Sequence, residues 1–188
     1  MVVEEAGAAE KVLREIEERS RQRFLPIVGP VKGQILEDLV REHRPQRILE
    51  VGALVGYSAI LMARLLPAGG RIWTLEADPR AVHRSRQNIQ RAGLEDRIEL
   101  VPGDARENIP KLVGPWDLVF LDGAKEEYLD YLHLAEPQIP KGGLVVADNI
   151  GIFAATLAPY LDYVRNSGKY QSRLHDFGFD AVEVSQRL

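Results

Sequence analysis

Residues 47–76 read RILEVGALVGYSAILMARLLPAGGRIWTLE, and this stretch decides the fold class. It begins with a short apolar strand, Arg47–Val51, which leads through a turn of small residues into an apolar helix, Ser58–Leu66. A second apolar strand follows at Arg71–Glu76. Two strands joined by a helix normally lie parallel in one sheet. The sequence therefore predicts an α/β protein.

The rest of the chain extends this alternation in both directions. Two helices are expected before it, at residues 8–23 and at Val31–His43. Further strands are expected at Arg97–Val101, Trp116–Asp122 and Gly143–Asp148. Further helices are expected at Pro79–Ala92, Ala105–Leu112, Glu126–Glu136 and Ala154–Asn166. The alternating segments Tyr170–Phe177 and Ala181–Gln186 predict a C-terminal antiparallel hairpin. Together these elements predict a doubly wound, Rossmann-like, mostly parallel seven-stranded sheet.

Composition limits the kinds of protein this can be. The 188 residues fit a single domain, expected to span 1–188, and the net charge of −4 gives no general reason to expect a nucleic-acid or membrane partner. The chain has no cysteine, which excludes disulfides, thiolate metal sites and cysteine nucleophiles. No apolar run approaches the length of a membrane span, and the N-terminus lacks a signal-peptide pattern. We expect a cytoplasmic protein.

Ligands of such sheets bind beyond the carboxyl ends of the strands, so the residues found there are the candidates for function. After the first strand, the small residues Gly52, Ala53 and Gly56 allow a tight turn close to a ligand, although a structural strand–helix turn explains them equally well. Leu54 and Tyr57 stand where a dinucleotide-binding loop needs glycine. Glu76 ends the second strand and is placed to accept ribose hydroxyls, because Asp78 before Pro79 is the better helix cap.

The ends of the fourth and fifth strands carry the strongest signal. Asp122 and Lys125 follow one strand, and Asp148 and Asn149 follow the other. Two carboxylates and an amide oxygen suit a hard divalent cation such as Mg²⁺ or Ca²⁺. Ordinary capping at strand ends is the alternative for each segment alone, but their joint presence favours a metal site. Asp104, after the third strand, has helix capping as its own alternative.

These motifs identify a family that the chain resembles, the catechol O-methyltransferases and their caffeoyl-CoA relatives. The likeness runs from Lys32 to Leu188 and includes several short motifs. They are Lys32-Gly33-Gln34, Gly52-Ala53, Gly56-Tyr57-Ser58-Ala59, residues 62–66 (MARLL), Phe120-Leu121-Asp122, Lys125, Tyr128-Leu129 and Ala147-Asp148-Asn149. The pairing of Asp-x-x-Lys with Asp-Asn, each after an apolar strand, is the most specific of these.

The resemblance implies a fold, a reaction and a set of roles. It implies the methyltransferase fold that binds S-adenosylmethionine (SAM), and methyl transfer to a metal-chelated hydroxyl of a catechol-like small molecule. The expected cofactor residues are Val28, Glu50, Gly52, Tyr57, Ser58, Glu76, Ala77, Gly103, Asp104, Ala105 and Asp122. The expected ligands of Mg²⁺, or of Ca²⁺ or Mn²⁺, are Asp122, Asp148 and Asn149. Lys125 is the expected general base, and the expected acceptor residues are Lys125, Asn149, Phe153 and Asp180.

The sequence also departs from the family pattern. The region before the second helix is short. Residues 1–30 are expected to form a helical lid or interface, which either covers SAM incompletely or is completed by a second copy in a homodimer. Gly123 and Ala124 replace bulkier residues of the catechol enzymes, and Phe153 replaces a proline. These changes leave the acceptor open.

Two other functions compete with a catechol-like acceptor. One is O-methylation of a hydroxyuridine-type tRNA base, which a basic patch of Arg80, Arg84, Arg86 and Arg91 would support. The other is a non-catalytic SAM-binding module, against which the intact Lys125, Asp148 and Asn149 argue.

Overall fold

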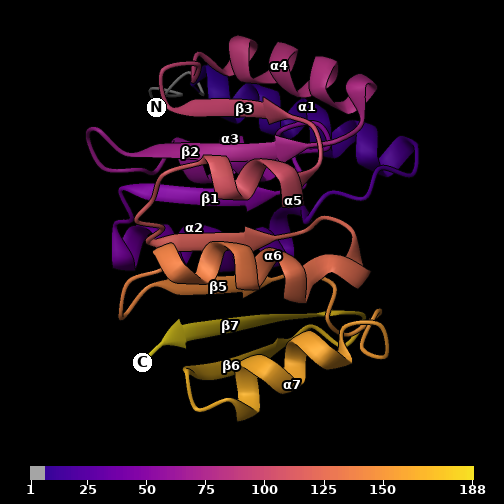
Figure 1. Ribbon diagram of the computed structural model, residues 1–188. Coiled ribbons are helices and arrows are strands. Elements are labelled where there is room, and N and C mark those ends of the chain that lie inside the picture. Colours follow the sequence, from indigo (N-terminus) through magenta and orange to yellow (C-terminus); the bar gives the residue numbers. More distant parts are fainter. Residues whose placement is uncertain (1–6) are drawn as a thin grey trace.

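The computed structural model describes residues 7–188, which form a seven-stranded sheet in the order β3-β2-β1-β4-β5-β7-β6 (Figure 1). The strands are β1 (Arg47–Val51), β2 (Arg71–Glu76), β3 (Ile98–Pro102), β4 (Leu118–Leu121), β5 (Leu144–Ala147), β6 (Tyr170–Asp176) and β7 (Ala181–Arg187). The pairings among β1 to β5 are parallel, whereas β7 is antiparallel to both β5 and β6. The predicted fold class is confirmed, including the C-terminal hairpin.

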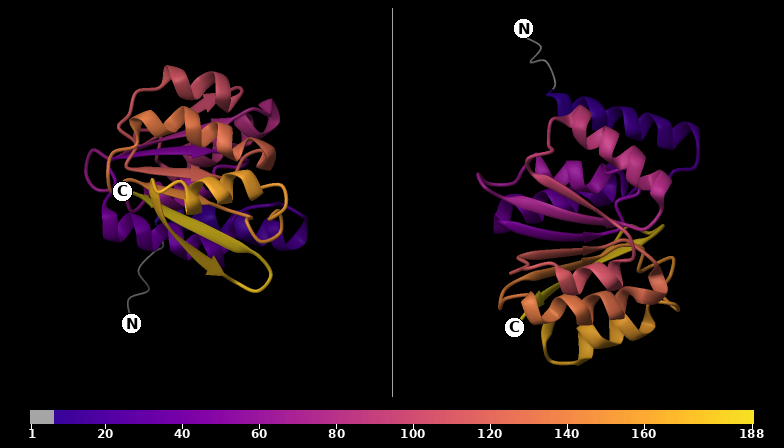
Figure 2. Two further views of the ribbon diagram at one scale, coloured as in Figure 1. Left: turned by 60° about the horizontal axis from the view of Figure 1, so that its bottom comes forward. Right: turned by 45° about the horizontal axis from the view of Figure 1, so that its top comes forward.

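Helices cover both faces of this sheet (Figure 2). The first face carries α1 (Ala8–Gln22), α2 (Gly29–His43), α3 (Tyr57–Ala63) and α4 (Pro79–Ala92). The second face carries α5 (Ala105–Asn108), α6 (Tyr128–Ala135) and α7 (Ala158–Asn166). The first helix, α1, packs on α3 and α4 rather than directly on the strands. Residues 1–6 of the predicted N-terminal segment lie outside the described residues.

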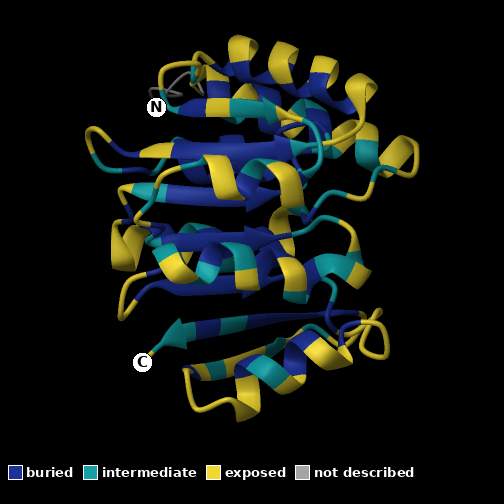
Figure 3. Ribbon diagram, viewed as in Figure 1, coloured by how far each residue is buried: buried dark blue, intermediate teal, exposed yellow. Residues whose placement is uncertain are grey.

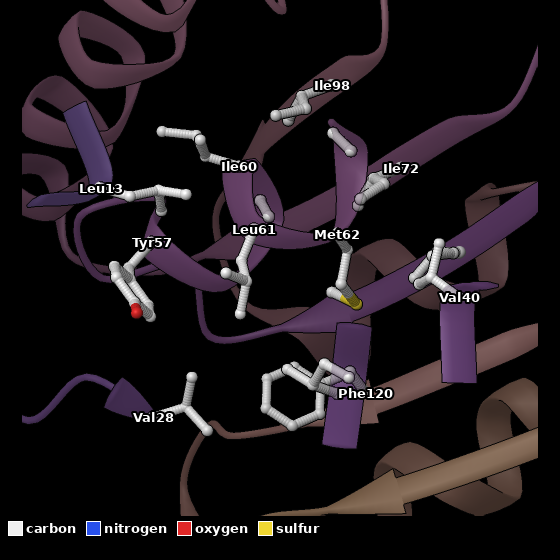
Figure 4. Packing of buried hydrophobic residues seen from close by; sticks show 14 of the residues in the cluster. Leu13, Val28, Val40, Tyr57, Ile60, Leu61, Met62, Ile72, Ile98 and Phe120 are labelled. Carbon is white, nitrogen blue, oxygen red and sulfur yellow. The ribbon is translucent and has the colours of Figure 1, made fainter. Parts of the chain in front are cut away.

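The strands hold two hydrophobic cores apart because neighbouring side chains point to opposite faces. In β1, Ile48 packs into the core under α2 and α3, while Leu49 packs into the core under α6 and α7. Figure 3 shows the central strands buried along most of their length. Figure 4 shows Met62 of α3 and Phe120 of β4 packed in the first core. Burial on both faces explains why these strands are almost continuously apolar.

Two prolines account for differences between the predicted and observed helices. The helix expected at Ala105–Leu112 ends at Asn108 and continues as a 3₁₀ turn, Ile109–Lys111, because Pro110 cannot donate a helical hydrogen bond. The last helix begins at Ala158, four residues later than expected, and Pro159 lies in its first turn, where a missing N–H costs nothing.

The topology brings the carboxyl ends of β1 to β5 to a common edge of the sheet (Figure 1). Because β7 runs the opposite way, its start lies at this same edge, and the Ile150 N–H donates to the Ala181 carbonyl at 3.0 Å. Asp180 is thereby placed beside the end of β5. No helix within residues 7–188 is long and apolar enough to cross a membrane.

Candidate active site

A cavity of about 880 Å³ lies at this edge of the sheet. Its size is in the range of pockets that hold small-molecule ligands. Most of the predicted site residues line it. They are Val28, Gly52, Glu76, Ala77, Gly103, Asp104, Ala105, Asp122, Lys125, Asp148, Asn149, Phe153 and Asp180. The structure thus brings most of the predicted cofactor residues and all three predicted metal residues to one cavity.

The loop after β1 forms one wall and is fixed by Glu76 at the end of β2. One Glu76 carboxylate oxygen accepts a hydrogen bond from the Leu54 N–H at 2.7 Å, and the other accepts from the Asp78 N–H at 2.9 Å. Leu54 has a left-handed φ of 50°, an uncommon conformation for a residue with a side chain. A carboxylate can accept about four hydrogen bonds, so Glu76 keeps capacity for ligand hydroxyls.

Gly52 lies where the two halves of the cavity meet. Its φ is 102°, and a Cβ on it would lie 2.4 Å from the backbone oxygen of Asp122. No side chain fits at that distance, so glycine allows the ends of β1 and β4 to approach closely.

The cavity does not reach three residues that were expected to cradle SAM. Glu50, Tyr57 and Ser58 are buried beneath the loop and are absent from its lining. The Tyr57 hydroxyl instead donates to Glu17 of α1 at 2.7 Å. Neither carboxylate oxygen of Glu50 has a hydrogen-bond partner among the described residues. Burial raises the pKa of Glu50 to about 7.

Asp104 has the capping role that was its alternative. Its carboxylate accepts from the Arg106 N–H at 2.8 Å at the start of α5 and pairs with the Arg106 side chain. It nevertheless lines the cavity beside Gly103 and Ala105. The end of β3 thus supplies a wall of mainly small residues, which suits a flat ring system.

The end of β4 carries Asp122 and Lys125 on the opposite wall. The Lys125 Nζ lies 2.8 Å from Asp122 Oδ1 and 2.9 Å from the Tyr128 hydroxyl, and that hydroxyl donates to the Asp148 carbonyl at 3.2 Å. Burial raises the pKa of Asp122 to about 7, while the charge of Lys125 lowers it. The amine is therefore held by Asp122 directly, and the Tyr128 hydroxyl of α6 links it to the end of β5.

The end of β5 carries Asp148 and Asn149. Asp148 Oδ1 accepts from the Lys32 Nζ at 2.6 Å and from the Asn149 N–H at 2.7 Å. Asn149 has a φ of 63°, which asparagine tolerates better than most residues, and its Nδ2 donates to Asp180 Oδ2 at 3.0 Å. The carboxylate of Asp180 also accepts from Lys32 at 2.7 Å and from the Ile152 N–H at 3.1 Å. Its observed partners are therefore protein groups; its role toward an acceptor stays a prediction.

The donor atoms fit a hard divalent cation. No group of three or more His, Cys, Asp or Glu side chains within residues 7–188 has a metal-binding arrangement. The predicted set, however, is two carboxylates and an amide. Asp122 and Asp148 each pair with a lysine through Oδ1, and Asn149 directs its Nδ2 to Asp180. Asp122 Oδ2, Asp148 Oδ2 and Asn149 Oδ1 thus remain for an oxygen-preferring ion.

The segment between α1 and α2 also contributes to the cavity, as do two loops near its mouth. Of the predicted lid, Val28 was expected as a cofactor residue, whereas Phe24, Pro26 and Ile27 were not named by sequence reasoning. Ile152 and Phe179 were missed as well. Phe24 is 94% exposed and Phe179 is 65% exposed, so both are apolar side chains at an open rim. Exposed apolar loop residues of this kind carry no periodic pattern that would reveal them in a sequence.

Comparison with known proteins agrees with this architecture. The chain is 39% identical over 174 residues to catechol O-methyltransferase B of Danio rerio, covering 88% of this chain and 65% of that protein. It is 40% identical over 168 residues to the transmembrane O-methyltransferase of Homo sapiens, covering 85% of this chain and 57% of that protein. The chain therefore spans less than two thirds of the length of these relatives.

A solved structure shares the fold over nearly the whole chain. It is the O-methyltransferase TomG of Streptomyces achromogenes in complex with SAM, with a TM-score of 0.81 and 25% identity, covering 100% of this chain and 92% of that one. The model of the O-methyltransferase family matches residues 3–168. The chain belongs to the O-methyltransferase family.

Proposed function

We propose that this protein transfers the methyl group of SAM to a hydroxyl of a catechol-like small molecule that is chelated by a divalent cation. One observation carries the proposal. A single cavity joins Glu76 and the glycine-lined loop on one side to Lys125, Asp122, Asp148 and Asn149 on the other. A methyl donor and an oxygen acceptor can therefore lie side by side.

The β1–β3 side supports SAM. Glu76 keeps acceptor capacity for the ribose hydroxyls after receiving its two backbone N–H groups. The small residues Gly103 and Ala105 leave room for the adenine ring. Binding both reactants in a fixed relation supplies much of the rate of an in-line displacement.

The β4–β5 side supports the acceptor. When bound, a divalent cation lowers the pKa of a coordinated phenolic hydroxyl. Asp122, Asp148 and Asn149 would hold the ion and leave positions for two adjacent acceptor oxygens. Phe153 lies close to Lys125, with the Nζ 6.0 Å from its ring centre, and offers an apolar surface for the acceptor ring.

Lys125 is the residue proposed to take the acceptor's proton. Its Nζ is held by Asp122 and by the Tyr128 hydroxyl, so its position is fixed before the acceptor binds. Asp122 can then accept a stronger hydrogen bond as the amine gains charge.

The other two functions receive no specific support. Arg80, Arg84, Arg86 and Arg91 are all exposed on α4 and none lines the cavity, while Arg91 pairs with Glu15 of α1. A non-catalytic module has no need for a lysine held at the cavity wall.

A substrate comparison tests the proposal. With labelled SAM and Mg²⁺, catechol should be methylated much faster than phenol, because only catechol offers two oxygens to one ion. Undermodified tRNA assayed in parallel should receive little label. Equal rates for catechol and phenol would contradict chelation, and preferential labelling of tRNA would replace the proposed acceptor.

A metal-depletion experiment tests the cation. Chelator should abolish turnover and added Mg²⁺ should restore it. Asp148→Ala should lose turnover while keeping its affinity for SAM, measured by calorimetry. Full activity of this variant in excess chelator would exclude the proposed metal role.

A further inference from the structure

Lys32 of α2 is a buried cation that the proposed mechanism does not use. It is 6% exposed, and its Nζ lies 2.6 Å from Asp148 Oδ1 and 2.7 Å from Asp180 Oδ2. Both carboxylates are almost completely buried as well. A lysine is rarely buried to this extent unless its charge is paired. The helix, the end of β5 and the start of β7 are therefore joined by one ammonium group.

These hydrogen bonds determine which oxygens already have a partner. Lys32 occupies Oδ1 of Asp148, which leaves Oδ2 of the same carboxylate for a ligand. Asp180 Oδ2 receives both the Lys32 Nζ and the Asn149 Nδ2. The amide of Asn149 is thereby oriented with Nδ2 toward Asp180 and Oδ1 away from it.

Asp180 is itself fixed by the backbone. Its Oδ1 accepts from the Ile152 N–H at 3.1 Å, and the Ile150 N–H pairs with the Ala181 carbonyl. The carboxylate thus has a defined orientation relative to the loop after β5. Hydrogen-bonded partners behind metal ligands commonly fix the geometry of a site and affect its affinity.

We propose that Lys32 and Asp180 act as one positioning unit that orients Asp148 Oδ2 and Asn149 Oδ1 toward the cavity and so sets the affinity for a divalent cation. This inference rests on the proposed metal site. It assigns Lys32 a role in orienting its neighbours. For the effect of removing Lys32 on metal affinity, it predicts the opposite of what charge repulsion alone would predict. Removing a positive charge near a cation site should strengthen metal binding. Removing a positioning group should weaken it.

A titration of the full chain with Mn²⁺, monitored by electron paramagnetic resonance in the absence of SAM and acceptor, distinguishes the charge prediction from the positioning prediction. We expect Lys32→Met to weaken Mn²⁺ binding about 10- to 100-fold, the usual effect of losing such a partner. Asp180→Asn should also weaken it, because the amide binds Lys32 and Asn149 less strongly. In the double variant the loss should be clearly smaller than the sum of the two single losses, as expected for groups that act as a unit.

The matched control is Arg165→Met, which removes the cation from another buried carboxylate, Glu183, away from the cavity lining. Its Mn²⁺ affinity should equal that of the wild type. Lys32→Arg, which retains the charge, should bind Mn²⁺ more tightly than Lys32→Met and keeps the test open if Lys32→Met does not fold. Unchanged or tighter binding by folded Lys32→Met, or strictly additive losses, would overturn the inference alone. Failure of the wild type to bind Mn²⁺ would overturn the proposed metal site and the inference with it.

Discussion

The two sides of the cavity are built by different means. On the β1–β3 side, Glu76 is held by backbone N–H groups, and Glu50 has no hydrogen-bond partner within the described part of the chain. On the β4–β5 side, Asp122 pairs with Lys125, and Asp148 pairs with Lys32. Within residues 7–188, Glu50 and Glu76 on the first side have no ion-pair partner, while Asp122 and Asp148 on the second side are already paired with lysines.

The difference indicates what each side requires from a ligand. Glu76 lines the cavity and keeps capacity for further hydrogen bonds, so the β1–β3 side gains most from a ligand that brings hydrogen-bond donors. SAM carries hydroxyls, an ammonium and a sulfonium. On the β4–β5 side the carboxylates of Asp122, Asp148 and Asp180 are already paired with Lys32 and Lys125, so the contribution of this side is the orientation of oxygens and of one amine. Variants on one side should therefore affect binding of SAM, and variants on the other should affect the chemical step.

Lys125→Met should produce the largest effect and should be confined to the β4–β5 side. We expect kcat to fall roughly 10²- to 10⁴-fold, which is the usual contribution of a general base. The Kd for SAM, measured by calorimetry, should be unchanged. Lys141→Met serves as the control because Lys141 is exposed and lies outside the cavity lining. A change in KM alone would make Lys125 a binding residue rather than the base.

Glu50 allows a test of the unpaired charge on the β1–β3 side. The pKa of Glu50 is raised from 4.5 to about 7 in the folded protein. As the pH rises between these two values, Glu50 ionises in the unfolded chain before it ionises in the folded one. The free energy of unfolding therefore falls over this pH range. The loss should be on the order of 3 kcal/mol, at about 1.4 kcal/mol per pH unit. Urea unfolding from pH 4.5 to 8, without SAM, should show a smaller decline for Glu50→Gln than for the wild type. If the stability of the wild type and of Glu50→Gln fell equally over this pH range, Glu50 would not ionise with a raised pKa in the folded protein.

Glu76→Ala should produce the smallest effect and should be confined to SAM. The affinity should fall by roughly 1–3 kcal/mol, because charge-assisted hydrogen bonds to the ribose are lost along with the support of the Leu54 loop. Glu76→Gln, which keeps an acceptor for the backbone, should lose less. Affinity for Mn²⁺ should not change in either variant. If Glu76→Ala bound SAM normally while folded, the ribose would have to lie elsewhere.

The sequence by itself determined the sheet and the edge at which the candidate site lies. The apolar strands of residues 47–51 and 118–121 are recognisable because a parallel sheet buries both of its faces, which leaves little choice of residue. Candidate ligands after these strands could be named in advance, since parallel strands bring their carboxyl ends to one edge. The Asp78 cap and the C-terminal hairpin follow from equally local rules.

Only the tertiary structure decided how those candidates are paired. The Lys32–Asp148 contact joins residues 116 positions apart, and no local pattern specifies a contact between distant elements. The same holds for Tyr57, whose hydroxyl binds Glu17 of α1 rather than facing the cavity. Asp180 reaches the proposed metal ligands because β7 is antiparallel to β5, so the start of β7 meets the end of β5. The periodicity of a strand and the chemical type of its residues depend on neighbouring positions in the sequence. The partner of a buried charge depends instead on which elements the fold packs together.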